Sequence, residues 1–377
     1  MDDSRKLTFN SVKRVVVKVG SGVLTRDDGL NLRAVKSISR QICRLIDDGL
    51  EVILVTSGAM ASGVKKIGLP GRPDEIPKRQ AVAAVGQAGL IMEYEKAFAQ
   101  YNRKVAQILL TSEDLDNRVR YLNARNTLHT LLSWEVVPII NENDTVMVEE
   151  IKVGDNDNLA AMITLLMDAD ILINLTDIDG LYTKDPRTQT DAELIPVVTH
   201  IRKNIEKIAG DIPGALGTGG MLSKVKAAKK VTSAGIPMVI SEGEKTDILV
   251  KLFSGEEHGT YFVPKTKKIK SRKCWIAFTL KSKGVIVVDD GAATAILKKG
   301  KSLLPSGIVA VEGEFSVGAP VECRKRDSEP VGKGLVNYSS ADVRRIMGLR
   351  SSKIKERLGY KPYDEVIHRD NLVITAA

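Results

Sequence analysis

Short runs of valine, isoleucine and leucine alternate with longer amphipathic segments over the first 264 residues. Six of these runs predict buried strands, at residues 14–19, 51–56, 105–111, 136–140, 171–176 and 238–241. Between the first two runs, apolar residues recur every three or four positions from residue 32 to residue 46, which predicts a crossover helix. Strands that alternate with helices form a mostly parallel sheet, so this part of the chain predicts an α/β domain.

The pattern changes after residue 264, where six basic side chains crowd into a segment with little apolar content: Lys265, Lys267, Lys268, Lys270, Arg272 and Lys273. Short alternating runs such as 284–288 and 307–311 follow, and no long helix is expected before 340–347. The predicted parts are a first domain, a basic linker and a small β-rich barrel, at 1–264, 265–274 and 275–377.

The composition of the 377 residues, 43% hydrophobic and 27% charged, is typical of a globular protein. The most apolar stretch, 159–175, is interrupted by Asp168 and Asp170, so no segment reaches the roughly 18 uninterrupted apolar residues of a membrane span. No apolar signal segment follows the N-terminal methionine, which favours a cytoplasmic protein. The three cysteines and four histidines are scattered and predict neither a structural metal site nor a nucleophile with its base.

The net charge of +9 is distributed unevenly. Residues 1–264 carry a net charge of −2, whereas residues 265–377 carry +11. A basic C-terminal part could attract a polyanion such as RNA, although charge asymmetry is more often the property of a solvated surface. Nucleic-acid binding therefore stays a hypothesis.

Neither common glycine-rich nucleotide motif occurs, which argues against a P-loop NTPase or a Rossmann dehydrogenase. Two other glycine-rich turns follow predicted strands: Lys18 precedes Gly20-Ser21-Gly22, and Ser57 stands in the run 56–60. Backbone N–H groups of such turns can approach a phosphate closely, and open α/β sheets bind ligands at the carboxyl ends of their strands. Taken alone, a glycine-rich turn after a strand is more often purely structural.

A third glycine-rich loop, 217–221, precedes a predicted helix that contains Lys224. The N–H groups of the loop and the positive end of the helix form an anion site, with the ammonium group one turn inside the helix. A phosphate site needs cations from two directions, and Lys18 and Lys224 are the evident pair. The alternative is a flexible linker before a surface helix.

Acid and amide side chains are densest in the runs 141–144 and 154–158. An N-cap of the helix that begins near Leu159 explains at least one of them, but the second run holds more polar side chains than one cap needs. The carboxylates could align the two lysines, and the amides could bind a polar substrate. Thr176 and Asp177, after the fifth predicted strand, stand where a nucleotide could bind, or they belong to an Asp-Gly turn.

Seven strings in this order resemble the amino acid kinase family: 17–21, 55–59, 106–111, 120–127, 141–144, 154–159 and 217–221. The segments 301–308 and 313–323 resemble a PUA domain. Within the family, the likeness is to the members that phosphorylate glutamate. One departure is Leu222-Ser223 before Lys224, where the family more commonly has threonine beside the lysine, although a hydroxyl group is kept.

The resemblance implies an amino acid kinase-like sandwich with a mostly parallel central sheet, followed by a PUA-like barrel. It implies ATP-dependent phosphorylation of the side-chain carboxylate of L-glutamate to L-glutamyl 5-phosphate, the first step of proline biosynthesis. ATP and Mg²⁺ would be the cofactors, with Mg²⁺ held mainly by the ATP phosphates and by no dedicated protein ligands. Feedback inhibition by proline and assembly into a homo-oligomer are further expectations.

The resemblance also implies three groups of site residues. The catalytic group consists of Lys18, Lys224 and Asp157, whose carboxylate orients both ammonium groups. The implied substrate-binding residues are Ser57, Asn141, Asp144, Asp155 and Asn156. The implied nucleotide-binding residues are Lys18, Thr176, Asp177, Thr218, Gly219, Gly220, Met221, Leu222, Ser223 and Lys224.

Two other interpretations stay open on sequence grounds. A kinase of the same fold could act on aspartate, N-acetylglutamate, carbamate or UMP, because substrate choice rests on the loops between residues 141 and 158. Alternatively, the chain could be an RNA-binding protein whose PUA-like domain carries the main function, although a kinase part with both lysines argues against this.

Overall fold

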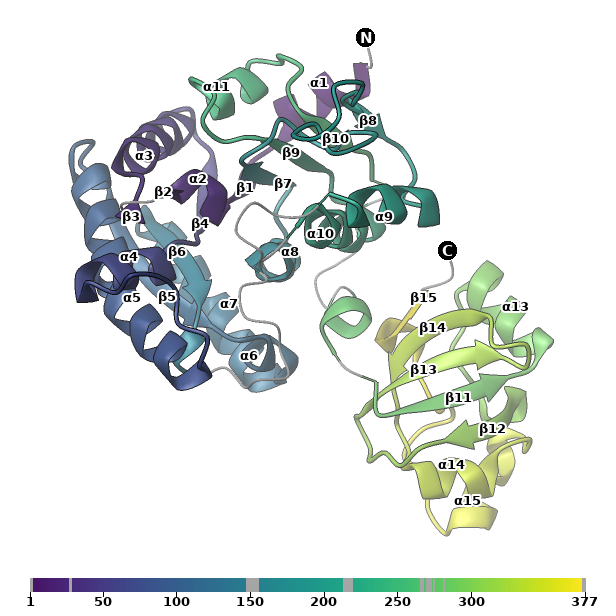
Figure 1. Cartoon of the computed structure of the whole chain (residues 1–377). Coiled ribbons are helices and arrows are strands. Elements are labelled where there is room, and N and C mark those ends of the chain that lie inside the picture. Colours follow the sequence, from purple (N-terminus) through teal and green to yellow (C-terminus); the bar gives the residue numbers. More distant parts are fainter. Residues whose placement is uncertain are drawn as a thin grey trace. The chain divides into compact units, whose positions relative to one another are not determined.

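The computed structural model describes residues 3–374 except 27–28, 147–155, 213–219, 265–267, 269–272, 274 and 281. The chain divides into two compact units, Met1–Lys268 and Ile269–Ala377 (Figure 1). Each unit has its own hydrophobic core. Among the described residues, no helix combines the length and the apolar character that a membrane crossing requires.

An eight-stranded sheet forms the centre of the first unit. Its strands lie in the order β5 (Lys104–Leu110), β6 (Val136–Glu142), β4 (Glu51–Val55), β1 (Arg14–Val19), β7 (Ile171–Thr176), β9 (Met238–Glu242), β10 (Thr260–Phe262) and β8 (Val197–Val198). All neighbours pair in parallel except β9 and β10. The six predicted strands are present, each within two residues of its predicted bounds. The predicted α/β fold is therefore confirmed.

Helices cover both faces of this sheet (Figure 1). One face carries α1 (Asp3–Ser11), α3 (Leu32–Asp47), α5 (Ile76–Ala99) and α11 (Ile248–Phe253), whose apolar side chains share one core with the strands. The other face carries α8 (Asn156–Leu166), which contacts β1, β4, β6 and β7 and packs against α10 (Met221–Ser233). The predicted crossover helix is α3. The other elements of this unit are α2 (Ser21–Leu24), α4 (Ala59–Ile67), α6 (Ser112–Asp116), α7 (Arg118–Ser133), α9 (Lys203–Gly210), β2 (Thr25–Arg26), β3 (Gly29–Leu30) and the 3-10 helix η1 (Asp144–Val146).

Strand β1 shows how the side chain of Lys18 can be buried next to an apolar core. Successive side chains of a strand point to opposite faces of the sheet. Val15, Val17 and Val19 enter the core shared with α3, whereas Lys18 points to the face that carries α8. In the neighbouring strand β7, the register pairs Lys18 with Asn174, so both side chains lie on the α8 face.

Two glycines allow α4 and α5 to cross in close contact. A Cβ atom at Gly63 would lie 1.9 Å from the carbonyl oxygen of Val82, and one at Gly86 would lie 1.8 Å from a carbonyl oxygen of α4. No larger residue fits at either position unless a helix moves. Ser57 lies just before α4 and Gln87 follows Gly86, so this crossing sets the distance between two polar residues of the site.

The second unit contains a five-stranded sheet in the order β12 (Ile308–Glu312), β11 (Gly284–Val288), β13 (Pro320–Lys325), β14 (Pro330–Leu335) and β15 (Leu372–Ile374). All neighbours are antiparallel except β11 and β13. Its helices and helical turns are η2 (Trp275–Thr279), α13 (Asp290–Lys299), η3 (Pro305–Gly307), α14 (Ser340–Ile346), η4 (Ser351–Lys353), α15 (Ile354–Leu358) and η5 (Arg369–Asn371). The β-rich character predicted for this part is confirmed.

The expectation that no long helix precedes residue 340 is wrong, because α13 spans 10 residues. Asp289 caps this helix by accepting the N–H of Ala292 at 2.7 Å, and Gly300 ends it with a φ of 56°. An aspartate N-cap and a glycine in the left-handed region are ordinary helix boundaries. The sequence between them is short and rich in alanine, so its hydrophobic periodicity is weak.

Candidate active site

Three charged side chains meet at the carboxyl ends of the central strands. Lys18 lies near the end of β1, and Asp157 and Lys224 lie in the first turns of α8 and α10. Lys18 Nζ is 2.6 Å from Asp157 Oδ1, and Lys224 Nζ is 3.3 Å from Asp157 Oδ2. The three residues are only 4%, 2% and 6% exposed in the order Lys18, Asp157, Lys224. We call them the lysine–aspartate cluster.

Two neutral side chains also bind the Asp157 carboxylate. Asn174 Nδ2 donates a hydrogen bond to Oδ1 at 2.8 Å, and Ser223 Oγ donates one to Oδ2 at 2.5 Å. Burial by itself raises the pKa of Asp157, but the charges of Lys18 and Lys224 outweigh burial and hold the pKa well below its usual range. The carboxylate is therefore ionised at neutral pH and keeps both ammonium groups in place.

A network of amide side chains lies next to the lysine–aspartate cluster. Asn156 Nδ2 donates to Ser57 Oγ at 3.0 Å and to Asn141 Oδ1 at 3.2 Å. Asn141, in β6, donates in turn to Gln87 Oε1 at 2.8 Å. The Oδ1 atom of Asn156 is buried and has no hydrogen-bond partner in the described part of the chain. Because buried acceptors are usually satisfied, this oxygen is suited to accept an N–H of a ligand.

Asp144 is the first residue of η1 and is half-buried. Burial raises the pKa of Asp144 to about 6, although the nearby charge of Arg72 opposes this shift. A desolvated carboxylate gains from a neighbouring cation, because the cation stabilises its charged form. Asp144 is therefore a suitable partner for the ammonium group of a substrate.

The turns that follow β1 and β7 pack closely together. Thr176 Oγ1 donates to Asp177 Oδ1 at 2.9 Å, and the N–H of Gly20 donates to the carbonyl of Leu175 at 2.9 Å. A Cβ atom at Gly22 would lie 2.9 Å from the side chain of Asp177. The glycines thus allow the first turn to approach the segment in which nucleotide-binding residues are predicted.

The third glycine-rich loop is described only at its end. Gly220 is the extended N-cap of α10, Met221 is buried and Leu222 is half-buried. Ser223 is the first residue of α10 whose side chain donates a hydrogen bond to Asp157. Three predicted site residues lie outside the described residues: Asp155, Thr218 and Gly219.

The sequence patterns do not predict two residues of this site, Gln87 and Asn174. Asn174 interrupts an otherwise apolar strand from Ile171 to Leu175, and a buried amide needs a hydrogen-bond partner. The sequence therefore contained a sign that this position contacts another polar group. Gln87 gives no comparable signal, because its position depends on how α4 and α5 cross.

The donors at this site are ammonium, amide and hydroxyl groups, which suit phosphate oxygens and the polar groups of an amino acid. Among the described residues, no three acidic, histidine or cysteine side chains are grouped as metal ligands. Mg²⁺ is usually held by one or two carboxylates together with substrate phosphates. The ammonium and hydroxyl donors of this site fit the phosphate end of a Mg²⁺–nucleotide complex.

Comparison with known proteins gives two family matches and several close relatives. Residues 13–241 match the amino acid kinase family, and residues 284–358 match the PUA domain. The glutamate 5-kinase of Syntrophus aciditrophicus is 52% identical over 374 residues, which cover 99% of this chain and 97% of the relative. The glutamate 5-kinases of Geobacter sulfurreducens and Syntrophotalea carbinolica are 51% and 50% identical over 97% and 98% of this chain, and over 98% and 99% of their own lengths. The solved UMP kinase of Bacillus anthracis is 14% identical, with a TM-score of 0.47 over 68% of this chain and 97% of its own.

Proposed function

This chain belongs to the amino acid kinase family, and we propose that it transfers the γ-phosphoryl group of ATP to the side-chain carboxylate of L-glutamate. The product is L-glutamyl 5-phosphate, and the reaction is the first step of proline biosynthesis. The observation that carries the proposal is the lysine–aspartate cluster, in which one buried carboxylate holds two ammonium groups. The choice of glutamate is supported by relatives that are named glutamate 5-kinase and match nearly the whole chain.

Phosphoryl transfer to a carboxylate depends on positioning and charge compensation. The side-chain carboxylate of glutamate is already ionised at pH 7, so no general base is needed. Lys18 and Lys224 come from different elements and would stabilise the charge on the transferred phosphoryl group from two sides. Asp157 would orient both lysines without entering the reaction.

Glutamate would bind beside the amide network. The unpartnered Oδ1 of Asn156 and the carboxylate of Asp144 are acceptors for its α-ammonium group, and Ser57 and Asn141 hold Asn156 in place. We assign Asp155 to the same group on the family resemblance. Asn156 directly precedes Asp157 in α8, so the amide network lies beside the lysine–aspartate cluster.

ATP would bind with its phosphates near the turn after β1 and the N-terminus of α10, because backbone N–H groups and the positive helix end favour anions there. When bound, Mg²⁺ would enter with ATP and shield the phosphate charge. The proposed nucleotide-binding residues are Lys18, Thr176, Asp177, Thr218, Gly219, Gly220, Met221, Leu222, Ser223 and Lys224.

The partners other than glutamate and ATP have less support. RNA binding as the main function is not favoured, because relatives that span both domains are named as kinases. Nucleic-acid binding by the PUA domain, feedback inhibition by proline and homo-oligomer formation stay predictions. Proline has an amino group and an α-carboxylate like those of glutamate, so it would compete for the same polar residues.

The test is ADP release by the purified full-length chain with glutamate, aspartate, N-acetylglutamate, carbamate and UMP offered separately. We expect kcat/KM for glutamate to exceed that for aspartate by at least about tenfold, since one methylene group can give this discrimination. A higher value with another acceptor would contradict the choice of glutamate. The variant Lys224→Ala, assayed in parallel, controls for a contaminating ATPase.

A further inference from the structure

We propose that Asn174 is a positioning residue for phosphoryl transfer, which holds the Asp157 carboxylate in the orientation that keeps Lys18 and Lys224 in place. This inference rests on the proposed kinase function. Asn174 would touch neither ATP nor glutamate, and it would act only through Asp157.

The strand register brings Asn174 to the lysine–aspartate cluster. Asn174 in β7 is the partner of Lys18 in β1, and both side chains lie on the face that carries α8. Asn174 is fully buried, and its neighbours along the strand are leucine and isoleucine. A buried amide is unfavourable unless it forms hydrogen bonds, so its partner shows what it does.

Each oxygen of the Asp157 carboxylate binds one ammonium group and one neutral donor. Oδ1 accepts from Lys18 at 2.6 Å and from Asn174 at 2.8 Å. Oδ2 accepts from Ser223 at 2.5 Å and from Lys224 at 3.3 Å. Asn174 and Lys18 both come from central strands, but the side chain of Asn174 is short, whereas that of lysine is a flexible four-carbon chain. Asn174 therefore holds its donor group in a more fixed position. The torsion that rotates a carboxylate is broad, so a rigid donor on one oxygen restricts it.

The other end of the Asn174 amide supports this reading. Its Oδ1 atom is buried and has no hydrogen-bond partner among the described residues. A buried acceptor without a partner destabilises the folded state, and an apolar residue of similar size would avoid this cost. The hydrogen bond from Nδ2 to Asp157 is therefore the better explanation for an amide at this position.

The first test replaces the amide by an apolar side chain of similar size. Asn174→Leu should lower kcat by about 10- to 100-fold, since small misplacements of reacting groups have effects of this size, and should leave KM for ATP and glutamate nearly unchanged. The matched control is Thr164→Val. Thr164, in α8, is as buried as Asn174, but its hydroxyl donates to the carbonyl of Ala160 at 2.7 Å and not to Asp157. The control should keep the wild-type kcat.

The second test gives a signature that a purely structural role would not show. In Asn174→Asp, the new carboxyl group can donate to Asp157 only while it is protonated, and above its pKa it repels Asp157 and attracts Lys18. The kcat of this variant should therefore fall as pH rises between 6 and 9, and the wild-type kcat should show no such fall. This pH profile decides the question if Asn174→Leu does not fold.

If Asn174→Leu folds, support for the inference requires both results, and if it does not fold, the pH profile of Asn174→Asp alone decides. The inference is wrong if Asn174→Leu loses no more activity than Thr164→Val, or if Asn174→Asp follows the wild-type pH profile. Wild-type protein that is inactive with glutamate but active with another acceptor contradicts the proposed function alone, and the Asn174 variants are then compared with that acceptor. No ADP release with any acceptor overturns both proposals.

Discussion

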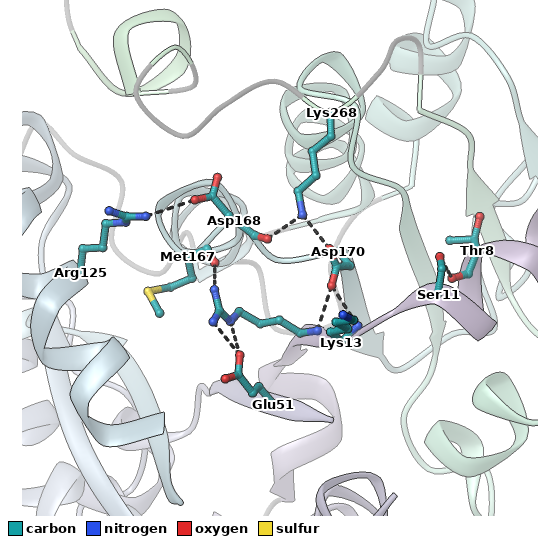
Figure 2. Close-up of polar contacts among 10 residues, drawn as sticks. Thr8, Ser11, Lys13, Glu51, Arg125, Met167, Asp168, Asp170 and Lys268 are labelled. Carbon is teal, nitrogen blue, oxygen red and sulfur yellow. Dashed lines mark hydrogen bonds and ion pairs between the residues drawn. The ribbon is translucent and has the colours of Figure 1, made fainter. Parts of the chain in front are cut away.

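The two ends of helix α8 carry charged clusters of different kinds. At its N-terminal end, the lysine–aspartate cluster places two cations on one carboxylate, and none of the three residues is more than 6% exposed. At its C-terminal end, Figure 2 shows Arg125 beside Asp168 and Lys268 beside Asp170, with every one of these side chains partly exposed. The two clusters hold similar groups, but only the first is removed from water.

The C-terminal cluster has an evident structural role. Its cations donate to carbonyl groups at and just beyond the end of α8, in the pairs Arg14 with Met167, Arg125 with Leu166, and Lys268 with Asp168. Cations at this position also complement the negative end of the helix dipole. Each cation faces its own carboxylate, in the pairs Arg14 with Glu51, Arg125 with Asp168, and Lys268 with Asp170. The C-terminal cluster, in which partly exposed cations and carboxylates are balanced, therefore holds the end of α8 in place. The lysine–aspartate cluster is buried and has more cations than carboxylates, so it suits an anionic ligand.

The largest difference between the two ends should be in stability. Asp157→Ala leaves two buried ammonium groups without their carboxylate, which should lower the free energy of unfolding by about 3–5 kcal/mol. Glu51→Ala removes a partner of the half-buried Arg14, but Glu51 itself is exposed, so the change should cost about 1 kcal/mol or less. Chemical denaturation at pH 7 measures both. Equal losses would contradict the distinction between the clusters.

The pH dependence sharpens this comparison. The pKa of Asp157 is lower in the folded chain than in the unfolded chain. Its contribution to stability is therefore complete above the unfolded pKa of about 3.9 and is lost as pH falls through the folded pKa. The difference in stability between wild type and Asp157→Ala should narrow below about pH 4.

The next effect concerns catalysis. Lys18→Ala and Lys224→Ala should each lower kcat by about 10²- to 10³-fold, the usual result of losing one preorganised charge donor. Arg125→Ala, at the other end of α8, should keep kcat within about twofold, because its exposed pair contributes little. Wild-type kcat in either lysine variant, at saturating ATP and glutamate, would remove that lysine from the mechanism.

The amide network should affect glutamate more than ATP. Asn156→Ala removes the link between Ser57 and Asn141, and buried groups left without partners cost about 1–3 kcal/mol each. We expect KM for glutamate to rise by about tenfold or more and KM for ATP to change little. Asp155→Ala should act in the same direction. A larger change in KM for ATP would show that glutamate binds elsewhere.

Asp144 should give a smaller effect that depends on pH. The pKa of Asp144 is raised to about 6, so the residue loses its negative charge as pH falls from 8 to 5. If it binds the α-ammonium group, KM for glutamate should rise by about tenfold or less over this range, because only the ionised form binds well. Asp144→Asn should show a high KM at every pH. An unchanged pH dependence in this variant would assign the titration to another group.

The smallest effect is expected at Lys268. Lys268→Ala removes an exposed ion pair with Asp170 and should change the free energy of unfolding by less than about 1 kcal/mol. It should leave kcat unchanged, because the other two cations still cap α8. A clear loss of kcat at unchanged stability would show that the C-terminal end of α8 also controls the lysine–aspartate cluster.

Local patterns were enough to predict much of the catalytic unit. The six apolar runs became its six main strands, and alternation along β1 placed Lys18 on the face opposite Val17. The same patterns marked the polar run that begins at Asn141, after a predicted strand, and the polar run around Asp157, before a predicted helix. These features follow from a period of two residues along a strand and from the chemistry of neighbouring residues, which are properties of short segments.

Only the tertiary structure decided which of these residues meet. Asp157 and Lys224 are 67 positions apart, and their contact depends on how α8 and α10 pack on the sheet. Asn174 reaches Asp157 because β7 pairs with β1, and Gln87 reaches Asn141 because two glycines let α4 and α5 cross closely. Strand order and helix crossing result from packing between segments far apart in sequence, and the hydrophobic pattern of one segment does not specify its neighbour.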